Sequence, residues 1–455
     1  MQTEVAAFLQ RIRAHPDDDA PRLIFADWLE EQFAAQLHSR NRTGTSLAVE
    51  WSEARGRFIR IQIALAQLKD ERTSEGELVR RPEREDMQKE LMREEQKLLN
   101  AHHAEWRASF EGIATGEIFH RGFVEEVNVT ARNFLRHADE LFAAGPLRHI
   151  HLFEPGGSLP GVLQIDLLSR LSALTIHASH AGEPLARAVA RSEHLAGLKN
   201  LRLSRNRFGD DGIQHLVTSP ILAKLEDLDL GDNELSETSA QMLAASPHFS
   251  AIRRLELQNN RLGPVGAEAI AASERFPQLQ RLGLAHNEIG TARLHTLSRT
   301  QGFLRVPVLD LSDNELRAAG LQVILNRFSG PADPSAIRLR DLDLSRNSTL
   351  GNDGMRVLAA CPHLNSLQVL RLGDCGIGDE GLRVLAQSPH LNSVVKLDLS
   401  NNPIGNVGCN ALLDRSHLRE LRFLILSTSM LSLGTKQKLA DTFPASDAFR
   451  GERDW

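Results

Sequence analysis

The sequence has few cysteines, no basic excess and no long apolar run. Its three cysteines, Cys361, Cys375 and Cys409, form no CxxC pair in a chain of 455 residues, which argues against a disulfide framework or a zinc ribbon. There are 53 lysines and arginines against 59 acidic residues, a net charge of −6, so nucleic acid is not an expected partner. No apolar run approaches the roughly 18 residues of a membrane helix, and the first residues lack a signal peptide's apolar core. We therefore expect a cytoplasmic protein without a membrane span.

The sequence also lacks the motifs of common enzymes. It contains no G-x-x-x-x-G-K-[ST], no H-E-x-x-H and no G-x-S-x-G. A ligase or hydrolase site in the N-terminal segment would need a reactive cysteine, and residues 1–122 contain none. We therefore predict a non-catalytic protein that holds no cofactor.

What the sequence does contain is one phrase, L-x-x-L-x-L-x-x-N-x-L, repeated through its second half. Clear copies are LEDLDLGDNEL from Leu225 and IRRLELQNNRL from Ile252, and degenerate copies begin at Leu171, Leu339 and Leu421. Successive copies start 27 or 28 residues apart, apart from one step of 33 between residues 306 and 339. Self-similarity at a fixed period predicts a repeat solenoid.

The residue pattern within one copy predicts a strand followed by a helix. Leu228 and Leu230 alternate with Asp229 and Gly231, which is typical of a short strand with one buried side. Helix-spaced apolar residues follow each strand. One repeat cannot bury its leucines alone, so stacking predicts an inner parallel sheet and outer helices.

The position that ends each strand carries a side chain suited to bond backbone groups of the turn. Asparagine has both donors and an acceptor, and these groups would otherwise be buried without partners. We therefore predict a structural ladder along the stack, formed by Asn206, Asn233, Asn260, Asn287, Asn314, Asn347, Cys375 and Asn402.

These repeats resemble ribonuclease-inhibitor-type leucine-rich repeats over roughly residues 145–431. The resemblance implies an α/β fold, a leucine-rich-repeat solenoid with an inner parallel sheet and outer helices, and it implies that Cys375 is a ladder residue rather than a reactive thiol. Two shortened repeats from Val124 and Leu147 would cover the N-terminal end. At the other end we expect Thr435 to cap a short helix with Leu439 and Phe443, and residues 328–336 to form a loop.

Residues 1–122 lack the repeat and predict an all-helical region. Apolar residues recur at helical spacing around Phe8, Phe25 and Phe58, and Pro82 is expected to begin a fourth helix. The strings HPDDDAPRLIFADWLEEQ and RGRFIRIQIALAQL resemble the bacterial repeat-companion domain, a module found at the N-terminus of repeat proteins. We therefore divide the chain into a helical segment, residues 1–122, and a solenoid, residues 123–455, that includes the shortened repeats and the C-terminal cap.

Two groups of residues are candidates for a metal site, but we predict that neither binds a metal. Asp17, Asp18 and Asp19 lack the spacing of a calcium loop, so we expect them to cap a helix and pair with Arg22. His149, His151 and His177 share one face of the predicted strands, with His180 just beyond. No carboxylate or cysteine completes a set with familiar zinc spacing.

The inner face of the solenoid is the candidate partner-binding surface because acidic residues recur along it. One interpretation is that L-D-L-S is repeat consensus with solvated carboxylates. The other is an acidic surface that binds a protein with a basic surface. The partner-binding residues predicted by the second interpretation are Asp229, Asp232, Glu256, Asp310, Asp313, Asp343, Asp374 and Asp398.

We therefore predict a protein–protein interaction scaffold or adaptor that binds its partner on the concave face. The alternative is a GTPase-activating protein or another regulator of an enzyme, since this repeat type also occurs in GTPase activators. Such a regulator would act through an exposed arginine in a turn, such as Arg207 or Arg261.

Overall fold

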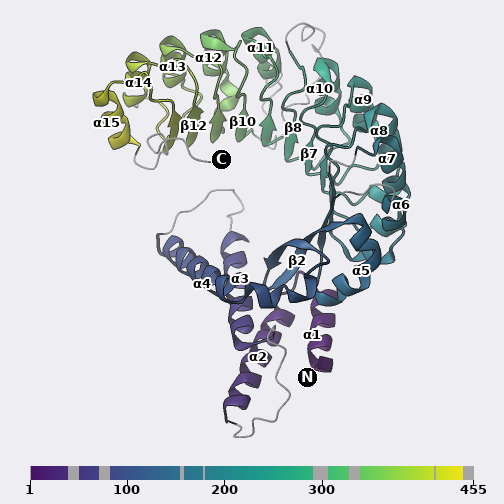
Figure 1. The fold of residues 1–455 in the computed structure, drawn as a ribbon. Coiled ribbons are helices and arrows are strands. Elements are labelled where there is room, and N and C mark those ends of the chain that lie inside the picture. The colour runs from purple at the N-terminus through teal and green to yellow at the C-terminus, as the bar shows by residue number, and fades with distance from the viewer. Residues whose placement is uncertain are drawn as a thin grey trace. The chain divides into compact units, whose positions relative to one another are not determined.

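The structure is a computed structural model that describes residues 2–38, 51–70, 82–153, 158–177, 180–290, 306–326, 339–414 and 417–443. The chain divides into two units, Met1–Ile176 and His177–Trp455. Figure 1 shows helices at the start of the chain and alternating strands and helices through the rest. The first unit thus joins the expected helical region to the shortened repeats, and the domain boundary after residue 122 remains a prediction.

The first unit begins with the predicted helical region. Its helices are α1 (Gln2–Ala14), α2 (Ala20–His38), α3 (Glu53–Asp70) and α4 (Pro82–Trp106). Pro82 begins α4 as expected, since proline lacks only an N–H that the first helical turn leaves unpaired anyway. The side chains that build the core beneath α1 to α3 include Val5, Leu9, Ile12, Phe25, Leu29, Trp51, Ile59, Ile63 and Phe123.

Asp18 caps α2, but the expected ion pair between the aspartates before this helix and Arg22 is wrong. Asp18 Oδ1 accepts a hydrogen bond from the Ala20 N–H at 2.9 Å. Arg22 is fully buried and instead pairs with Glu125 on a strand more than 100 residues later. A buried guanidinium needs a buried carboxylate, and exposed aspartates beside it in the sequence do not meet that need.

The last part of the N-terminal segment contains a strand that the helical interpretation missed. Strand β1 (Thr115–His120) pairs antiparallel with β2 (Phe123–Thr130). Arg121 and Gly122 join them with φ angles of 50° and 90°, the geometry of a type I′ hairpin turn. A Cβ on Gly122 would lie 2.2 Å from Ile59 Cγ1, so only glycine fits where the hairpin meets α3. The R-G pair between two alternating segments was the available signal.

The first unit ends with parallel strands. β2 pairs with β3 (His149–Phe153), which pairs with β4 (Ala173–Ile176). The helices α5 (Ala131–Ala144) and α6 (Leu159–Val162) connect them. The shortened repeats therefore have the strand and helix order of full repeats, and β1 pairs with the edge of β2 that would otherwise be open.

Replacing Glu125 with alanine should destabilise the first unit strongly. The change leaves the buried Arg22 charge without its carboxylate, and losing one partner of a buried pair costs about 3–5 kcal/mol. Chemical denaturation monitored by tryptophan fluorescence measures the loss. The double variant Arg22→Met with Glu125→Leu should recover most of it, and equal loss in both variants would contradict this account of the pair.

The second unit contains parallel strands that pair in chain order. Residues at matching repeat positions face one another, as in Leu228 with Leu255 and Leu342 with Leu370. The strands are β5 (Asn200–Arg202), β6 (Asp227–Asp229), β7 (Arg254–Glu256), β8 (Arg281–Gly283), β9 (Val308–Asp310), β10 (Asp341–Asp343), β11 (Val369–Arg371), β12 (Lys396–Leu399) and β13 (Phe423–Leu426).

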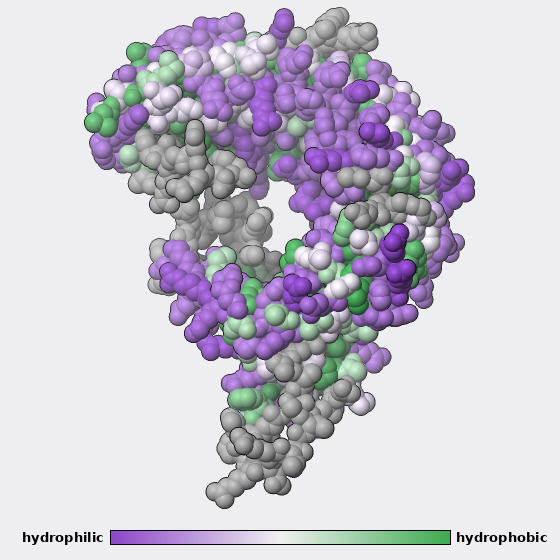
Figure 2. All heavy atoms as spheres, viewed as in Figure 1, coloured by the Kyte–Doolittle hydropathy of each residue, from purple (hydrophilic) through white to green (hydrophobic). Residues whose placement is uncertain are grey.

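The helices of the second unit cover one side of this sheet, as Figure 1 shows. Together with the strands they form the leucine-rich-repeat solenoid predicted from the sequence. Figure 2 shows mainly hydrophilic residues on the visible surface of these repeats, since the strand leucines are buried beneath the helices. The helices are α7 (Gly182–Arg191), α8 (Gly209–Val217), α9 (Glu237–Ala245), α10 (Gly263–Ala272), α11 (Ala318–Asn326), α12 (Gly351–Ala360), α13 (Asp379–Ala386), α14 (Asn406–Leu413) and α15 (Leu433–Thr442).

The residues predicted as a ladder are all buried and bond from one repeat to the next. Asn260 Oδ1 accepts hydrogen bonds from the N–H groups of Asn233 and Leu235, both at 3.0 Å. Its Nδ2 donates to the carbonyls of Leu230 and Leu257 at 3.1 and 2.9 Å. Each such side chain therefore satisfies backbone groups in its own turn and in the preceding repeat.

Cys375 occupies the same position with a smaller set of bonds. Its Sγ lies 3.1 Å from the Leu344 carbonyl, and its N–H donates to Asn402 Oδ1 at 3.0 Å. Burial raises the pKa of its thiol to about 12, so the sulfur is a thiol rather than a thiolate at neutral pH.

A second ladder, of serines, follows the ends of the helices and was not predicted. Ser219 Oγ donates to the Ala190 carbonyl and Ser246 Oγ to the Val217 carbonyl, both at 2.7 Å. Ser273 and Ser388 make the equivalent bonds. The serines at 219, 246 and 273 share the 27-residue step of the leucines, which was the available signal.

The C-terminal helix has the expected buried residues and a different cap. Leu439 and Phe443 are almost fully buried. The N-cap is Ser432, whose Oγ accepts from the Thr435 N–H at 3.3 Å, so the prediction of Thr435 as the cap is wrong by one helical turn. The loop predicted at residues 328–336 lies outside the described residues.

Replacing Asn260 with alanine should lower the free energy of unfolding by about 1–3 kcal/mol, because it leaves buried backbone groups without partners. Denaturant titration of the full chain measures the change. The control is Gln241→Ala on the exposed side of α9, for which we expect little effect. An unchanged midpoint for the Asn260 variant would show that the ladder contributes nothing.

Candidate functional site

The inner face of the second unit is the side of the sheet that the helices leave open. Strand residues alternate, so the residue between the two strand leucines points away from the helices in every repeat. Register pairs these residues directly across neighbouring strands, as in Asp229 with Glu256 and Asp310 with Asp343. We call this line the central column: Arg202, Asp229, Glu256, Gly283, Asp310, Asp343, Arg371, Asp398 and Ile425.

Arginines within and beside the central column pair with some of the carboxylates on the inner face. Glu256 Oε1 lies 2.5 Å from Arg281 Nε. On the adjoining strand positions, Asp227 pairs with Arg254 at 2.9 Å and Asp341 with Arg371 at 2.5 Å. The inner face therefore carries both acidic and basic side chains, and the acidic ones outnumber the basic ones.

The aspartates of the central column also bond their own turns. Asp229 Oδ1 accepts from the Gly231 N–H at 2.9 Å. Asp310, Asp343 and Asp398 accept from the N–H two residues later at the same distance. This bond gives the repeated L-D-L-S pattern a structural reason, since an aspartate at this position satisfies a turn donor. One carboxylate oxygen is thus used within the repeat.

Crowding of acidic groups on this face affects their ionisation. Burial raises the pKa of the Asp229 carboxyl, and the neighbouring Asp227 raises it further. Burial likewise raises the pKa of Glu256 and of Asp343. These carboxylates are held at some cost when ionised, so a cation approaching the inner face gains more from them than from fully solvated ones.

Three arginines and three acidic side chains line an open depression at one end of the central column. Its volume is about 370 Å³. Small residues, Gly231 and Gly283 among them, lie beside these charged side chains on the sheet. The depression therefore suits charged side chains of a partner rather than an apolar ligand, and its lining is Arg202, Asp227, Asp229, Arg254, Glu256 and Arg281.

The remaining predicted partner-binding residues lie in the turns after the strands. Asp232, Asp313 and Asp374 have φ angles of 53–55°, a left-handed conformation that aspartate tolerates better than most residues. Asp313 lies 2.8 Å from His286 and Asp232 lies 3.8 Å from Arg205. These three aspartates therefore lie apart from the central column. Their left-handed backbone conformation explains why aspartate suits these positions.

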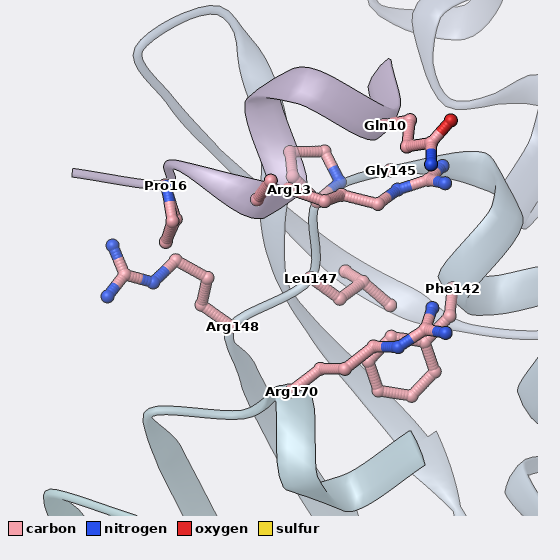
Figure 3. A pocket seen from close by; sticks show the side chains of 10 residues that line it. Gln10, Arg13, Pro16, Phe142, Gly145, Leu147, Arg148 and Arg170 are labelled. Atoms are coloured by element: carbon pink, nitrogen blue, oxygen red, sulfur yellow. The ribbon is translucent and has the colours of Figure 1, made fainter. Parts of the chain in front are cut away.

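The first unit has a depression of its own, about 300 Å³ in volume, with an apolar floor and arginines around it. Figure 3 shows the Arg170 side chain beside the Phe142 ring. Arg148 pairs with Asp17 at 2.6 Å, whereas Arg13 donates to the Ala143 carbonyl at 2.7 Å. Burial and the nearby Arg170 lower the pKa of Arg13. Its arginines suit this surface to an anionic group, and their positions in the chain follow no period that would have indicated it.

The three histidines that we considered for a metal site do not all lie together. His177 lies in the second unit and bonds Ser204 at 2.9 Å. His149 and His151 lie in the first unit with Glu126, and one ligand atom of each falls within 4.8 Å of the others. The carboxylate that we found missing from the sequence is therefore present, because strand pairing rather than sequence spacing brings it there.

Comparison with known proteins matches part of the chain to leucine-rich repeats. Similar solved structures include a yeast complex of Rad7 and Elc1, at 13% identity over 84% of this chain and 89% of that chain with a TM-score of 0.46, and an internalin from Listeria monocytogenes, at 17% identity over 63% and 69% with a TM-score of 0.35. No curated protein matches the sequence. A family model described as leucine-rich repeat matches residues 198–217, 252–271, 339–359, 363–386 and 390–413.

The family match lies wholly in the second unit and shows leucine-rich repeats there. The resemblance of the N-terminal segment to the repeat-companion domain remains a prediction. Within the described residues, no helix has the length and apolar character needed to cross a bilayer.

Removing the Asp343 carboxylate in two ways should separate its structural role from its charge. Asp343→Ala deletes the acceptor for the Ser345 N–H and should cost about 1 kcal/mol of unfolding free energy. Asp343→Asn keeps an acceptor and should preserve stability at neutral pH. Equal destabilisation by the two substitutions in denaturant titrations would contradict the assigned bond.

Comparing Asp343→Asn with the unmodified chain also tests the raised pKa of Asp343. A carboxyl whose folded pKa exceeds its unfolded pKa destabilises the fold above the folded pKa, and this cost disappears as the pH falls through that value. The stability of Asp343→Asn relative to the unmodified chain should therefore be greatest at neutral pH and decline in acid. A relative stability that rises in acid would contradict the direction of the shift.

Proposed function

We propose that the chain is a non-catalytic interaction protein that binds a second protein on the inner face of the second unit. The observation that supports this most is the central column, in which five of the nine residues are half-buried acidic side chains held in register with their neighbours. Leucine-rich-repeat solenoids offer extended concave surfaces to partners, and the charges here lie on that surface. A cytoplasmic location, as expected from the three cysteines, belongs to the same proposal.

The partner that fits this surface carries basic side chains at its centre. Acidic residues outnumber basic ones on the inner face, and burial already disfavours their ionised state. Lysines or arginines of a partner would relieve that cost, while Arg254, Arg281 and Arg371 restrict where they can bind. Such complementarity contributes mostly to association rate and selectivity.

The inner face is large enough for a stable complex. At about 4.8 Å between neighbouring strands, β5 to β13 span about 40 Å. A standard protein interface buries about 800 Å² on each partner, which a surface of this length can provide.

The alternative, an enzyme regulator acting through an exposed arginine, has less support. Arg207 lies 3.6 Å from Glu234, which offsets its charge locally. The Arg261 N–H bonds the Leu235 carbonyl, a contact that places its backbone in the repeat stack. Neither arginine is set apart from other surface residues, whereas acidic residues recur along the central column.

Neutralising the central column should weaken partner binding while the fold is retained. The variant is Asp310→Asn, Asp343→Asn and Asp398→Asn, because asparagine still accepts the N–H of each turn. The partner is first captured with the unmodified chain as bait. We expect the affinity of the variant for this partner to fall by about tenfold or more at low salt and by less at high salt, since salt screens exposed charges. Surface plasmon resonance at two salt concentrations measures both.

The matched control removes the same charge from residues away from the inner face, using Asp211→Asn, Glu274→Gln and Asp441→Asn. These side chains are exposed on or next to the outer helices. Circular dichroism and thermal unfolding should show both triple variants folded. Undiminished binding by the folded inner-face variant, or an equal loss in the control, would contradict the proposal.

A further inference from the structure

Two imidazoles and a carboxylate meet on neighbouring strands of the first unit. Glu126 lies on β2, and His149 and His151 lie on β3. Glu126 Oε1 is 2.6 Å from His151 Nε2, and Glu126 Oε2 is 3.3 Å from His149 Nδ1. The three side chains therefore already present nitrogen and oxygen atoms to a common point.

Strand geometry explains why these residues converge. His149 and His151 are two residues apart on one strand, so they point to the same face, and their ring centroids are 4.0 Å apart. Register places Glu126 directly beside His149 on the adjacent parallel strand. The His-x-His pattern supplies two ligands from one strand, and the pairing supplies the third.

A neighbouring strand orients one of the histidines. His149 Nε2 lies 2.9 Å from Thr175 Oγ1 on β4, and the Thr175 side chain is buried. This contact leaves Nδ1 of the same ring facing Glu126. Metal-bound histidines usually hold their second ring nitrogen in such a bond, which fixes the tautomer and the ring orientation.

The site is accessible from solvent. The side chains of Glu126, His149 and His151 are 19%, 15% and 26% exposed, so a small ion can reach them from solvent.

We propose that Glu126, His149 and His151 bind a divalent transition-metal ion, with Zn²⁺ as the best match. Imidazole nitrogen with carboxylate oxygen suits zinc and its neighbours, whereas Ca²⁺ and Mg²⁺ prefer all-oxygen sites. Three protein ligands leave a fourth tetrahedral position for water or for a donor from a partner.

His120 is close enough to be the donor at the fourth position. His120 Nε2, on the hairpin strand β1, is 3.8 Å from Glu126 Oε2. Because its side chain is about half exposed, His120 can turn toward the ion. A metal there would join β1, β2 and β3, the strands at the start of the first unit.

Zinc titration of the full chain by isothermal calorimetry, with thermal unfolding in parallel, tests the proposal. We expect one high-affinity site and a Zn²⁺-dependent rise in melting temperature. Glu126→Gln, His149→Ala and His151→Ala should each weaken Zn²⁺ binding by at least about tenfold and remove the rise in melting temperature. Each variant is compared with its own metal-free melting temperature, so a change in intrinsic stability is measured separately.

The matched control is His286→Ala. His286 also contacts a carboxylate, Asp313 at 2.8 Å, but among the described residues this pair has no third metal-binding side chain close to it. Its substitution should leave Zn²⁺ affinity and stoichiometry unchanged.

Substitutions of Thr175 test its role as a positioning residue. Thr175→Val removes the hydroxyl at nearly constant volume and should weaken Zn²⁺ binding by about tenfold, whereas Thr175→Ser should restore it. The proposal is overturned if Zn²⁺ does not bind, or if the folded Glu126 and histidine variants bind as tightly as the unmodified chain. Equal affinity of the valine and serine variants would remove Thr175 from the site.

Discussion

The second unit depends on one constraint: the backbone groups in each inner turn must find partners in the neighbouring repeat. The side chain of Asn260 bonds two N–H groups and one carbonyl of the preceding repeat and one carbonyl of its own. Because every turn is completed from the next repeat, strands at equal repeat positions must align. The leucines then fill a continuous core, and a repeat at the end of the stack requires a cap such as α15.

That alignment creates the surface we consider functional. A strict repeat length brings equivalent residues to neighbouring strands, so a preference for aspartate at one position becomes a line of carboxylates. The turn bond from Asp343 to Ser345 shows that such a residue also has a local role. The two interpretations of the L-D-L-S pattern are thus compatible: one oxygen holds the turn, and the charge of the group shapes the inner face.

The features that could be predicted from the sequence are those that recur in every repeat. The strands, the buried leucines and the positions of Asn206 to Asn402 follow from a 27-residue period that a single sequence displays. The missed features depend on pairs that no period marks. Arg22 and Glu125 are distant in the chain, β1 is defined by its hairpin partner, and Glu126 joins His149 only through strand register. On the inner face, pairs such as Arg281 with Glu256 join neighbouring repeats.

Site-resolved hydrogen exchange of the unmodified chain tests the central claim most directly. The backbone N–H groups of Asn233 and Leu235 both donate to Asn260 Oδ1, outside any helix or strand pairing. If the ladder holds the repeats together, these turn amides exchange as slowly as the strand amides of the same repeats. Exchange at the rate of solvent-exposed turns would contradict the account, because the stack would then be held by its leucines alone.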